Sequence, residues 1–442
     1  MAQILVLGGG LAGLAAASVL GSAGHEVELC ESRAFLGGRA TSYAAPAPDG
    51  APVEIIDNCQ HILMKCCVHL LDFYERLGVR DKVHFFNEFF FLEPGGRTSR
   101  LRAGLLPSPL HFTGSFLRMS CLSLSDKLAL GRAILTLRRE RTTRKDLEQI
   151  TMMDWLNEQR QPPQVVERFW RQVLVSAINE ELDRMAAIHG FQVFWLGFLA
   201  RSDAYEMGVP SVPLSELYGS PGWSKLPQVR LHLRAPVEKI LVEHGRVTGV
   251  QAGGELRRAD YYLSGLSFEK LGPLLPALEL PLHEFEHVPI TGIHLWFDRP
   301  VTDLPHGTML DRSMHWFFNK NEGRYLQLVV SASRNLTHMS RQEVIDLAVR
   351  ELGEFLPLVR TAQLEKAHVV KEMRATFSAR PGLDAFRPKP DTKLPNFFLA
   401  GDWTHTGWPS TMEGAVRSGY LAAEAVCRAA GTPRTFMLPE IG

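Results

Sequence analysis

The first forty residues place the strongest constraint on the fold of this chain. An apolar segment over residues 4–7 leads into three consecutive glycines, and an alanine- and leucine-rich segment follows over 11–22. A second strand is predicted over 27–30, and Glu31 comes directly after it. A strand, a glycine turn, a helix and a second strand that ends at an acid predict a βαβ unit for a dinucleotide.

Each residue type in this unit has its own predicted role. Gly8 permits the sharp turn, Gly10 lets the backbone approach a pyrophosphate, and Gly13 lets the helix pack closely on the strand. The helix N-terminus then faces the phosphates. Glu31 lies eighteen residues after Gly13, where its carboxylate can accept hydrogen bonds from ribose hydroxyls.

Length and charge limit the class of protein without naming a partner. A chain of 442 residues exceeds one compact core, so we expect two domains or one domain with large insertions. Its 48 basic residues balance its 48 acidic ones, and we expect no nucleic-acid partner. No apolar run reaches the roughly 18 uninterrupted residues of a membrane span, so the chain is not expected to cross a bilayer.

The six cysteines include no CxxC pair, which favours a reducing cytoplasm. We therefore expect a cytoplasmic protein, with peripheral contact to the inner face of the cytoplasmic membrane as an extension of that expectation. Cysteines and histidines cluster between residues 59 and 69, but adjacent cysteines chelate one ion poorly. No metal site is predicted, and the thiols are interpreted as small buried side chains.

Two glycines and an arginine follow the acid after one short loop, at Gly37, Gly38 and Arg39. Backbone amides and a guanidinium suit the second side of a pyrophosphate or a flavin. This order of acid, loop and Gly-Gly-Arg resembles the flavin-containing amine oxidase and phytoene desaturase superfamily, which binds FAD. The superfamily usually has an Asp-x-Gly turn close to the flavin, and Cys59, two residues after Asp57, departs from it.

A second motif near the C-terminus carries the same resemblance. Residues 397–402 are predicted as a buried strand that ends in Gly401 and Asp402, and an alanine-rich helix opens after Thr411. In the superfamily this strand end binds the ribityl and phosphate groups, and the helix N-terminus holds negative charge at the flavin. No cysteine lies near 403–412, so FAD is expected to be bound noncovalently.

The resemblance implies an α/β fold with a Rossmann-like FAD-binding domain of the glutathione-reductase type and an inserted α+β substrate domain. Strand patterns over 229–264 supply the middle part of the FAD-binding domain, with Val237 near the adenine. We assign residues 1–75, 205–275 and 385–442 to the FAD-binding domain, and 76–204 and 276–384 to the substrate domain. The predicted cofactor-binding residues are Gly8, Gly10, Leu11, Ala12, Gly13, Glu31, Ser32, Arg33, Gly38, Arg39, Val237, Gly401, Asp402, Thr411, Met412 and Glu413.

One segment, residues 95–145, carries eleven lysines and arginines but only two acids. Leucines and phenylalanines are interleaved with these charges, which favours an anionic lipid surface over nucleic acid as the partner. A solvated basic face over an ordinary core is the alternative. Aromatic residues cluster at 85–91, 191–198 and 316–318, where some could line a tunnel for a long apolar isoprenoid substrate.

Three blocks, 57–63, 294–300 and 401–415, are similar to the squalene-associated FAD-dependent desaturase family, whose members act as hydroxysqualene dehydroxylases in hopanoid biosynthesis. This resemblance implies reductive removal of an allylic hydroxyl from hydroxysqualene to give squalene, with an electron donor that the sequence does not identify. His61 is the first candidate for the acid or water-orienting group, followed by Asp57 and His405. Each of these three can instead be a structural residue that satisfies loop backbone.

Other functions stay open at this point. A carotenoid or phytoene desaturase would use the flavin oxidatively on a similar lipid. A flavin amine oxidase usually places a lysine on the strand entering the substrate domain, and that position falls at Gly292. A noncatalytic flavoprotein that presents lipid to a partner is the remaining alternative.

Overall fold

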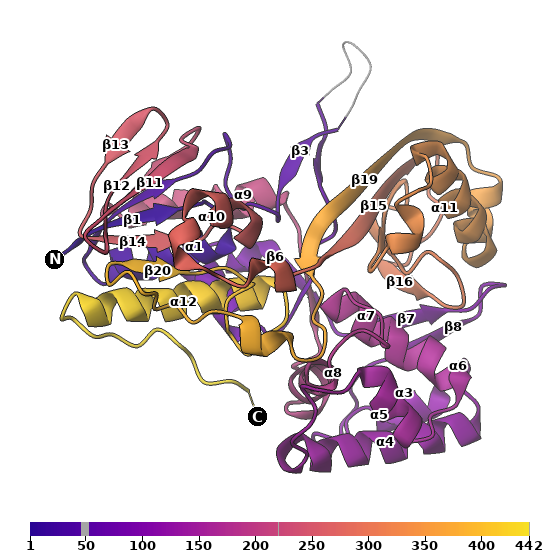
Figure 1. Ribbon diagram of the computed structural model, residues 1–442. Helices are drawn as coiled ribbons and strands as arrows, with labels where there is room; N and C mark the ends of the chain where they lie inside the picture. Colours follow the sequence, from indigo (N-terminus) through magenta and orange to yellow (C-terminus); the bar gives the residue numbers. More distant parts are fainter. Residues whose placement is uncertain (46–52, 220, 442) are drawn as a thin grey trace.

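Five parallel strands form a sheet to which the N-terminal and the C-terminal parts of the chain both contribute. The computed structural model describes residues 1–45, 53–219 and 221–441 (Figure 1). The strands lie in the order β10, β2, β1, β14, β20, and every pairing is parallel. Their bounds are β1 (Gln3–Leu7), β2 (Glu26–Cys30), β10 (Val229–His232), β14 (Tyr261–Ser264) and β20 (Phe397–Leu399).

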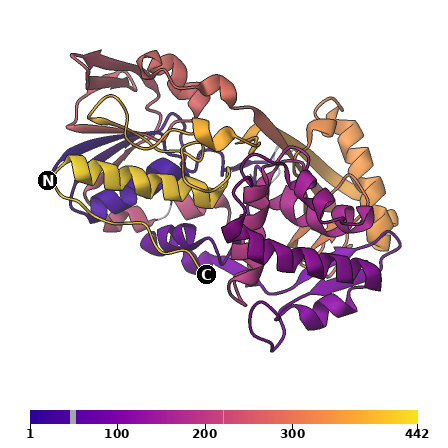
Figure 2. The ribbon, with the colours of Figure 1, turned by 60° about the horizontal axis from the view of Figure 1, so that its bottom comes forward.

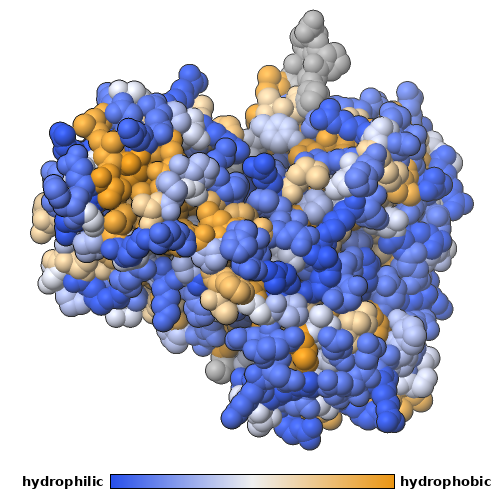
Figure 3. Space-filling view, in the orientation of Figure 1, coloured by the Kyte–Doolittle hydropathy of each residue, from blue (hydrophilic) through white to orange (hydrophobic). Residues whose placement is uncertain are grey.

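Different layers cover the two faces of this sheet. On β1, Ile4 and Val6 share a core with helices α1 (Leu11–Ser22) and α12 (Met412–Ala429). Leu5 and Leu7 belong to the core that includes the small antiparallel sheet. Since successive side chains of a strand alternate between faces, a strand covered on both faces is apolar throughout. The small sheet consists of β11 (Val237–Glu243), β12 (Arg246–Ala252) and β13 (Glu255–Arg257), and apolar surface lies over it in Figure 3.

Helices α1 and α12 lie side by side, as Figures 1 and 2 show. Gly419 makes this approach possible, because a Cβ atom at this position would lie 2.3 Å from the carbonyl oxygen of Ala12. Residues near the two ends of the sequence therefore share one tightly packed layer. The predicted α/β fold class is confirmed, and the domain boundaries given above stay predictions.

A seven-stranded mixed sheet forms the centre of the second part of the molecule. Its order is β19, β15, β18, β17, β16, β7, β8. On β15, Ile293 and Leu295 pack with Val344 of helix α11 (Arg341–Phe355) in one core. Gly292 of β15 lies against the chain after β4 (Ile55–Asp57), because a Cβ atom there would be 2.9 Å from the carbonyl oxygen of Asn58. The strands are β19 (Leu364–Phe377), β15 (His287–Phe297), β18 (Tyr325–Val330), β17 (Trp316–Asn321), β16 (His306–Met309), β7 (Phe89–Leu92) and β8 (Thr98–Leu101).

A helical layer completes this part and lies at the lower end of Figure 1. Ser123 and Asp126 form a capping box that starts α4, and Thr151 and Asp154 form the one that starts α5. Buried tryptophans and phenylalanines fill the space between these helices. The layer comprises α3 (Thr113–Arg118), α4 (Leu124–Thr143), α5 (Met152–Glu158), α6 (Pro163–Val165), α7 (Gln172–Ile178), α8 (Ala187–Phe194), and the π-helical turns Val166–Arg171 and Trp195–Leu199.

Shorter elements complete the fold. They include β3 (Ser42–Ala44), β4 (Ile55–Asp57), β5 (Leu63–Met64), β6 (Val83–Phe86), β9 (Met207–Pro210), α2 (Val68–Arg76), α9 (Leu214–Tyr218) and α10 (Phe268–Leu274). Single 3₁₀ turns lie at Arg80–Lys82, Pro221–Lys225, Pro276–Leu278, Leu282–Glu284, Arg334–Leu336, Pro357–Arg360 and Leu383–Phe386.

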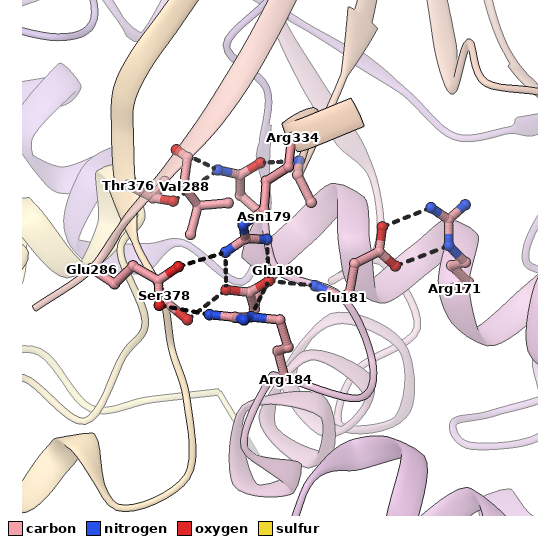
Figure 4. Close-up of polar contacts among 11 residues, drawn as sticks. Arg171, Asn179, Glu180, Glu181, Arg184, Glu286, Val288, Arg334, Thr376 and Ser378 are labelled. Atoms are coloured by element: carbon pink, nitrogen blue, oxygen red, sulfur yellow. Dashed lines mark hydrogen bonds and ion pairs between the residues drawn. The ribbon is translucent and has the colours of Figure 1, made fainter. Parts of the chain in front are cut away.

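A buried polar cluster joins the helical layer to the mixed sheet (Figure 4). Asn179 ends α7 in a left-handed conformation with φ of 61°, and its side chain donates to Thr376 Oγ1 at 2.8 Å. The next residue, Glu180, has a fully buried side chain that accepts two hydrogen bonds from Arg334, at 2.7 and 2.8 Å. Ser378 donates a third at 2.5 Å. Burial favours the neutral acid, but these donors, with Arg334 first, hold the pKa of Glu180 below its usual range.

Replacing Glu180 by alanine is expected to lower the free energy of unfolding by about 3 kcal/mol, the lower end for a broken buried pair. The lower end applies because the Arg334 side chain keeps 32% of its exposure and regains some hydration. Urea unfolding of the FAD-bound protein measures the loss. The double variant Glu180→Leu, Arg334→Met leaves no unpaired charge and should recover part of the loss. A double variant as unstable as the sum of its two single variants would contradict this account.

Candidate active site

The glycine turn after β1 leaves open space at the N-terminus of α1. Gly8 has φ of 100°, a conformation that favours glycine. A Cβ atom on Gly13 would lie 2.0 Å from the carbonyl oxygen of Gly8, so only glycine lets the helix lie this close. At Gly10, by contrast, the nearest atom to an added Cβ is 4.0 Å away. The first-turn amides, which include those of Leu11 and Ala12, have no intrahelical acceptor and can bind phosphate.

Glu31 is buried at the end of β2 and shapes this turn. One carboxylate oxygen accepts the N–H of Gly9 at 2.8 Å. The other accepts the N–H of Arg33 at 2.8 Å and the hydroxyl of Ser32 at 3.0 Å. A carboxylate has about four acceptor positions, so one remains for a ribose hydroxyl. The backbone N–H of Ala235 donates to the carbonyl of Glu31 at 2.8 Å, which brings the start of β11, including Val237, toward the acid.

The second glycine pair packs directly on the first turn. Gly37 donates its N–H to the carbonyl of Gly9 at 2.8 Å. A Cβ atom on Gly38 would lie 2.9 Å from the Cα atom of Gly10, and Gly38 has φ of 63°. The Arg33 side chain donates to the carbonyl of Gly38 at 3.0 Å. The two loops therefore form one cradle of backbone amides.

Arg39 connects this cradle to the C-terminal motif. Its guanidinium binds the carboxylate of Asp402, which also accepts a hydrogen bond from Ser410. Although burial opposes ionisation, Arg39 and the Ser410 hydroxyl hold the pKa of Asp402 below its usual range. Gly401, with φ of 133°, turns the chain just before it. An anionic group and its cationic partner are thus fixed where the strand end, the glycine cradle and α12 meet.

Thr411 starts α12 by accepting the N–H of Gly414 at 3.0 Å. The side chain of Glu413 points to helix α2, and a cofactor contact by Glu413 at the start of α12 stays a prediction. Its buried carboxylate accepts the backbone N–H of Leu70 at 2.8 Å and hydrogen-bonds with His69 Nδ1 at 2.6 Å. It therefore caps helix α2. The hydroxyl oxygen of Tyr218 lies 3.9 Å from the sulfur atom of Met412.

The end of β4 and the turn after it contain two of the three predicted catalytic residues. Asp57 accepts hydrogen bonds from the Ser42 hydroxyl at 2.6 Å and the N–H of Leu214 at 3.0 Å, so its carboxylate holds neighbouring backbone. His61 Nδ1 lies 2.9 Å from the carbonyl of Cys59 and must carry the proton there. Burial lowers the pKa of His61, which keeps the ring neutral. Its Nε2 atom has no hydrogen-bond partner in the part of the chain that the structure describes.

His405, the third candidate, is not brought into this cluster. Its side chain is exposed, and its backbone N–H donates to the carbonyl of Pro388 at 2.9 Å. Among the described residues, no hydrogen bond orients the His405 side chain. The geometry therefore favours His61 over His405 as a proton-transfer group.

Lys320 is a functional candidate that the sequence analysis missed. It lies on β17, and its ammonium donates to the side-chain oxygen of Gln60 at 2.9 Å, beside His61. Burial lowers the pKa of Lys320, an effect that the charge of Asp57 opposes. At Gly292 an added Cβ atom would lie 2.9 Å from the carbonyl of Asn58, so no side chain fits there. The lysine that reaches this turn thus comes from another strand than in the amine oxidases.

Aromatic rings run from the helical layer to the same strand, β17. We call them the aromatic row, and they are Phe112, Phe198, Phe89, Trp316 and Phe318. Ring centroids are 6.0 Å apart for Phe112 and Phe198, 6.2 Å for Phe198 and Phe89, 6.2 Å for Phe89 and Trp316, and 6.0 Å for Trp316 and Phe318. Lys320 comes two residues after Phe318 on β17, at an irregularity of the strand between Asn319 and Asn321, and its ammonium reaches Gln60. The row therefore leads to the turn that contains His61.

The described part of the chain forms neither a metal-binding cluster nor a membrane-spanning helix. Among residues 1–45, 53–219 and 221–441, no three histidine, cysteine or acidic side chains are grouped to hold a metal ion. In the same ranges, no helix combines the length and apolar composition needed to cross a bilayer.

Comparisons with known proteins agree with a cofactor-binding role for this cradle. A family model described as flavin containing amine oxidoreductase matches residues 11–427. The probable zeta-carotene desaturase of Synechococcus elongatus is 27% identical, with 97% of this chain and 99% of the relative covered. The 15-cis-phytoene desaturase of the same organism is 25% identical, with 96% and 95% covered. An oxidoreductase structure from Methanosarcina mazei has a TM-score of 0.71 at 17% identity, over 94% of this chain and 98% of that one.

The sequence-based identification as a hydroxysqualene dehydroxylase is wrong. The relatives that align with nearly the whole chain are named zeta-carotene and phytoene desaturases. Two of the blocks behind that identification, 57–63 and 401–415, lie at the cofactor cradle. Motifs that hold a cofactor recur among enzymes with different substrates, so they do not identify a substrate.

The residues of the cradle fit FAD. The open space above Gly10 suits the phosphates of a dinucleotide. The carboxylates of Glu31 and Asp402 suit its sugar groups. The predicted FAD cofactor is confirmed by the family match. The chain therefore belongs to the flavin containing amine oxidoreductase family, and it is an FAD-dependent oxidoreductase.

Proposed function

We propose that this protein desaturates a long isoprenoid hydrocarbon of the carotene type. The observation that carries this proposal is the alignment of 96–97% of the chain with zeta-carotene and phytoene desaturases. The aromatic row supports it, because ring faces pack well against an apolar chain of conjugated or isolated double bonds. A flavin amine oxidase is disfavoured because Gly292, the usual lysine position, has no room for a side chain.

The proposed division of roles follows from the geometry. When bound, FAD supplies the two-electron acceptor for a hydride from an allylic carbon. The chain holds the cofactor through the glycine cradle, Glu31 and Asp402. The aromatic row aligns the hydrocarbon and excludes water. His61, neutral and with Nε2 unpartnered among the described residues, can accept the proton that leaves the neighbouring carbon.

An anaerobic half-reaction tests the proposal. The oxidised FAD-bound protein is mixed with phytoene or zeta-carotene dispersed in detergent, while flavin and polyene absorbance are followed together. We expect bleaching of the flavin and formation of about one longer polyene per flavin, since each desaturation removes two electrons. Putrescine, a simple diamine, serves as the comparison and should leave the flavin oxidised.

The outcomes separate the candidate functions. Flavin reduction by putrescine but by neither carotene would overturn the proposal in favour of amine oxidation. A flavin that stays oxidised with both carotenes, in protein shown to bind them, would leave the lipid-presenting flavoprotein as the better account. His61→Ala should slow flavin reduction by about 10²-fold or more, the usual range for a lost proton acceptor, while FAD content stays unchanged.

A further inference from the structure

The outer side of helix α4 is apolar although it faces solvent. Leu124, Leu128 and Leu135 are 69%, 63% and 64% exposed. Their spacing of four and seven residues places them on one stripe of the helix. On the opposite side, Leu130 and Leu137 are buried in the core. The buried side already accounts for the packing of α4, so the outer leucines have no role in the fold.

A second group of exposed leucines precedes this helix. Leu105, Leu106 and Leu110 lie on the loop before α3 and are 107%, 50% and 56% exposed, and Leu117 at the end of α3 is 58% exposed. The ammonium of Lys127 donates to the carbonyl of Leu117 at 2.8 Å, which ties α3 to the first turns of α4. We call these residues and the α4 stripe the leucine face. It belongs to the lower end of Figure 1, which Figure 2 turns forward.

Unpaired positive charges flank the leucine face. Helical spacing places Arg132 on one side of the α4 stripe and Arg138 on the other. These two and Arg118 are exposed, and none has an acidic side chain within 4 Å in residues 1–45, 53–219 and 221–441. Asp126, an acid on α4, is buried and bonded to Ser123. The surface therefore combines apolar side chains with net positive charge.

We propose that the leucine face docks on the surface of an anionic phospholipid bilayer. Its leucines would enter the boundary between headgroups and acyl chains, and the three arginines would bind lipid phosphates. A second copy of this chain fits less well, because the same arginines would face one another across a symmetric contact. Docking is peripheral, in keeping with the absence of a spanning helix in the described ranges.

The loop of the leucine face also contacts two residues beside the aromatic row, Tyr205 and Leu199. The N–H of Ala103 donates to the hydroxyl of Tyr205 at 2.9 Å, and Ser108 binds the carbonyl of Leu199. Phe112, which follows the loop, is the outer end of the row, and its ring lies 4.7 Å from that of Tyr205. Docking would thus place the outer end of the row at the bilayer. This last link rests on the proposed function, whereas docking itself does not.

Vesicle sedimentation of the FAD-bound protein tests docking without any substrate. Vesicles contain equal parts phosphatidylcholine and phosphatidylglycerol, and a second set contains phosphatidylcholine alone. The variant Leu124→Gln, Leu128→Gln, Leu135→Gln should bind the anionic vesicles at least about tenfold less than the unmodified protein. The variant Arg118→Gln, Arg132→Gln, Arg138→Gln should lose most of its preference for anionic vesicles.

The matched control changes three exposed leucines elsewhere: Leu233→Gln, Leu256→Gln, Leu358→Gln. It should bind as the unmodified protein does. Equal binding by the control and the α4 variant would overturn the proposal. A leucine-dependent dimer in gel filtration, with no vesicle binding, would also overturn it and assign the face to a second copy. Turnover of detergent-dispersed carotene is measured separately, so failure of docking and failure of the proposed activity remain distinguishable.

Discussion

Between pH 7.5 and pH 5.5 the free energy of unfolding is expected to fall by about 5 kcal/mol, because four histidines are buried in their neutral form. Burial lowers the pKa of His294 and of His315 to about 3. It lowers the pKa of His306 and of His189 to about 4. All four side chains are at most 5% exposed. Native stability is typically about 5–15 kcal/mol, so acid unfolding is expected near about pH 5.

The direction of this effect follows from proton binding. An unfolded histidine takes up a proton near about pH 6.5, whereas the folded protein keeps these rings neutral down to about pH 4. Below pH 6.5 the unfolded state therefore binds more protons, and its free energy falls relative to the native state. The stability is fully present above the unfolded pKa and is lost as the pH decreases from there.

Urea unfolding at a series of pH values measures this dependence. His306→Phe is the informative variant, because its ring packs among Phe86, Phe90 and Phe318 and a phenyl ring suits those neighbours. It should reduce the fall in the free energy of unfolding between pH 7.5 and pH 5.5 by about 1.4 kcal/mol, the contribution of one of the four histidines. A stability that stays constant from pH 7.5 to pH 5.5 would show that these rings are not buried neutral.

The cofactor cradle follows from local sequence, and this explains why so much of it could be predicted. The roles of Gly8, Gly10, Gly13 and Glu31 depend on turn geometry and on strand and helix periodicity within a few tens of residues. The second sheet and the aromatic clusters were also partly predictable from apolar patterns. The elements that pack against this sheet and these clusters were not predictable, because a pattern shows which side of an element is buried and not what covers it.

The missed features all join residues that are far apart in the chain. His69 and Glu413 are separated by 344 positions, and Lys320 and Gln60 by 260. No spacing rule connects such residues, so the contact of the Glu413 carboxylate with α2 could not be predicted from the sequence. The substrate was misassigned for another reason, since two of the three blocks used for it lie at the cofactor cradle. The exposed leucines of α4 were visible in the sequence, but only the structure separates them from the buried ones.

Replacing Gly13 by alanine is expected to abolish FAD retention and to lower the free energy of unfolding by about 4 kcal/mol. The added Cβ atom would lie 2.0 Å from the carbonyl oxygen of Gly8, and 3.3 Å from a methyl group of Val6. A backbone carbonyl cannot rotate away as a side chain can. Relief therefore requires α1 to move off β1, which opens the cradle at the point where the pyrophosphate binds.

Two measurements distinguish lost FAD binding from a general loss of stability. The flavin-to-protein absorbance ratio after purification should be near zero for Gly13→Ala. Added FAD should raise the unfolding free energy of the unmodified protein, by RT ln(1 + [FAD]/Kd), but not that of the variant.

Gly131→Ala is the matched control, because Gly131 lies within α4 and an added Cβ meets no atom within 4 Å. It should keep its FAD and gain up to about 1 kcal/mol from better helix propensity. Full FAD retention by Gly13→Ala would mean that the close contact between α1 and the turn does not determine cofactor binding.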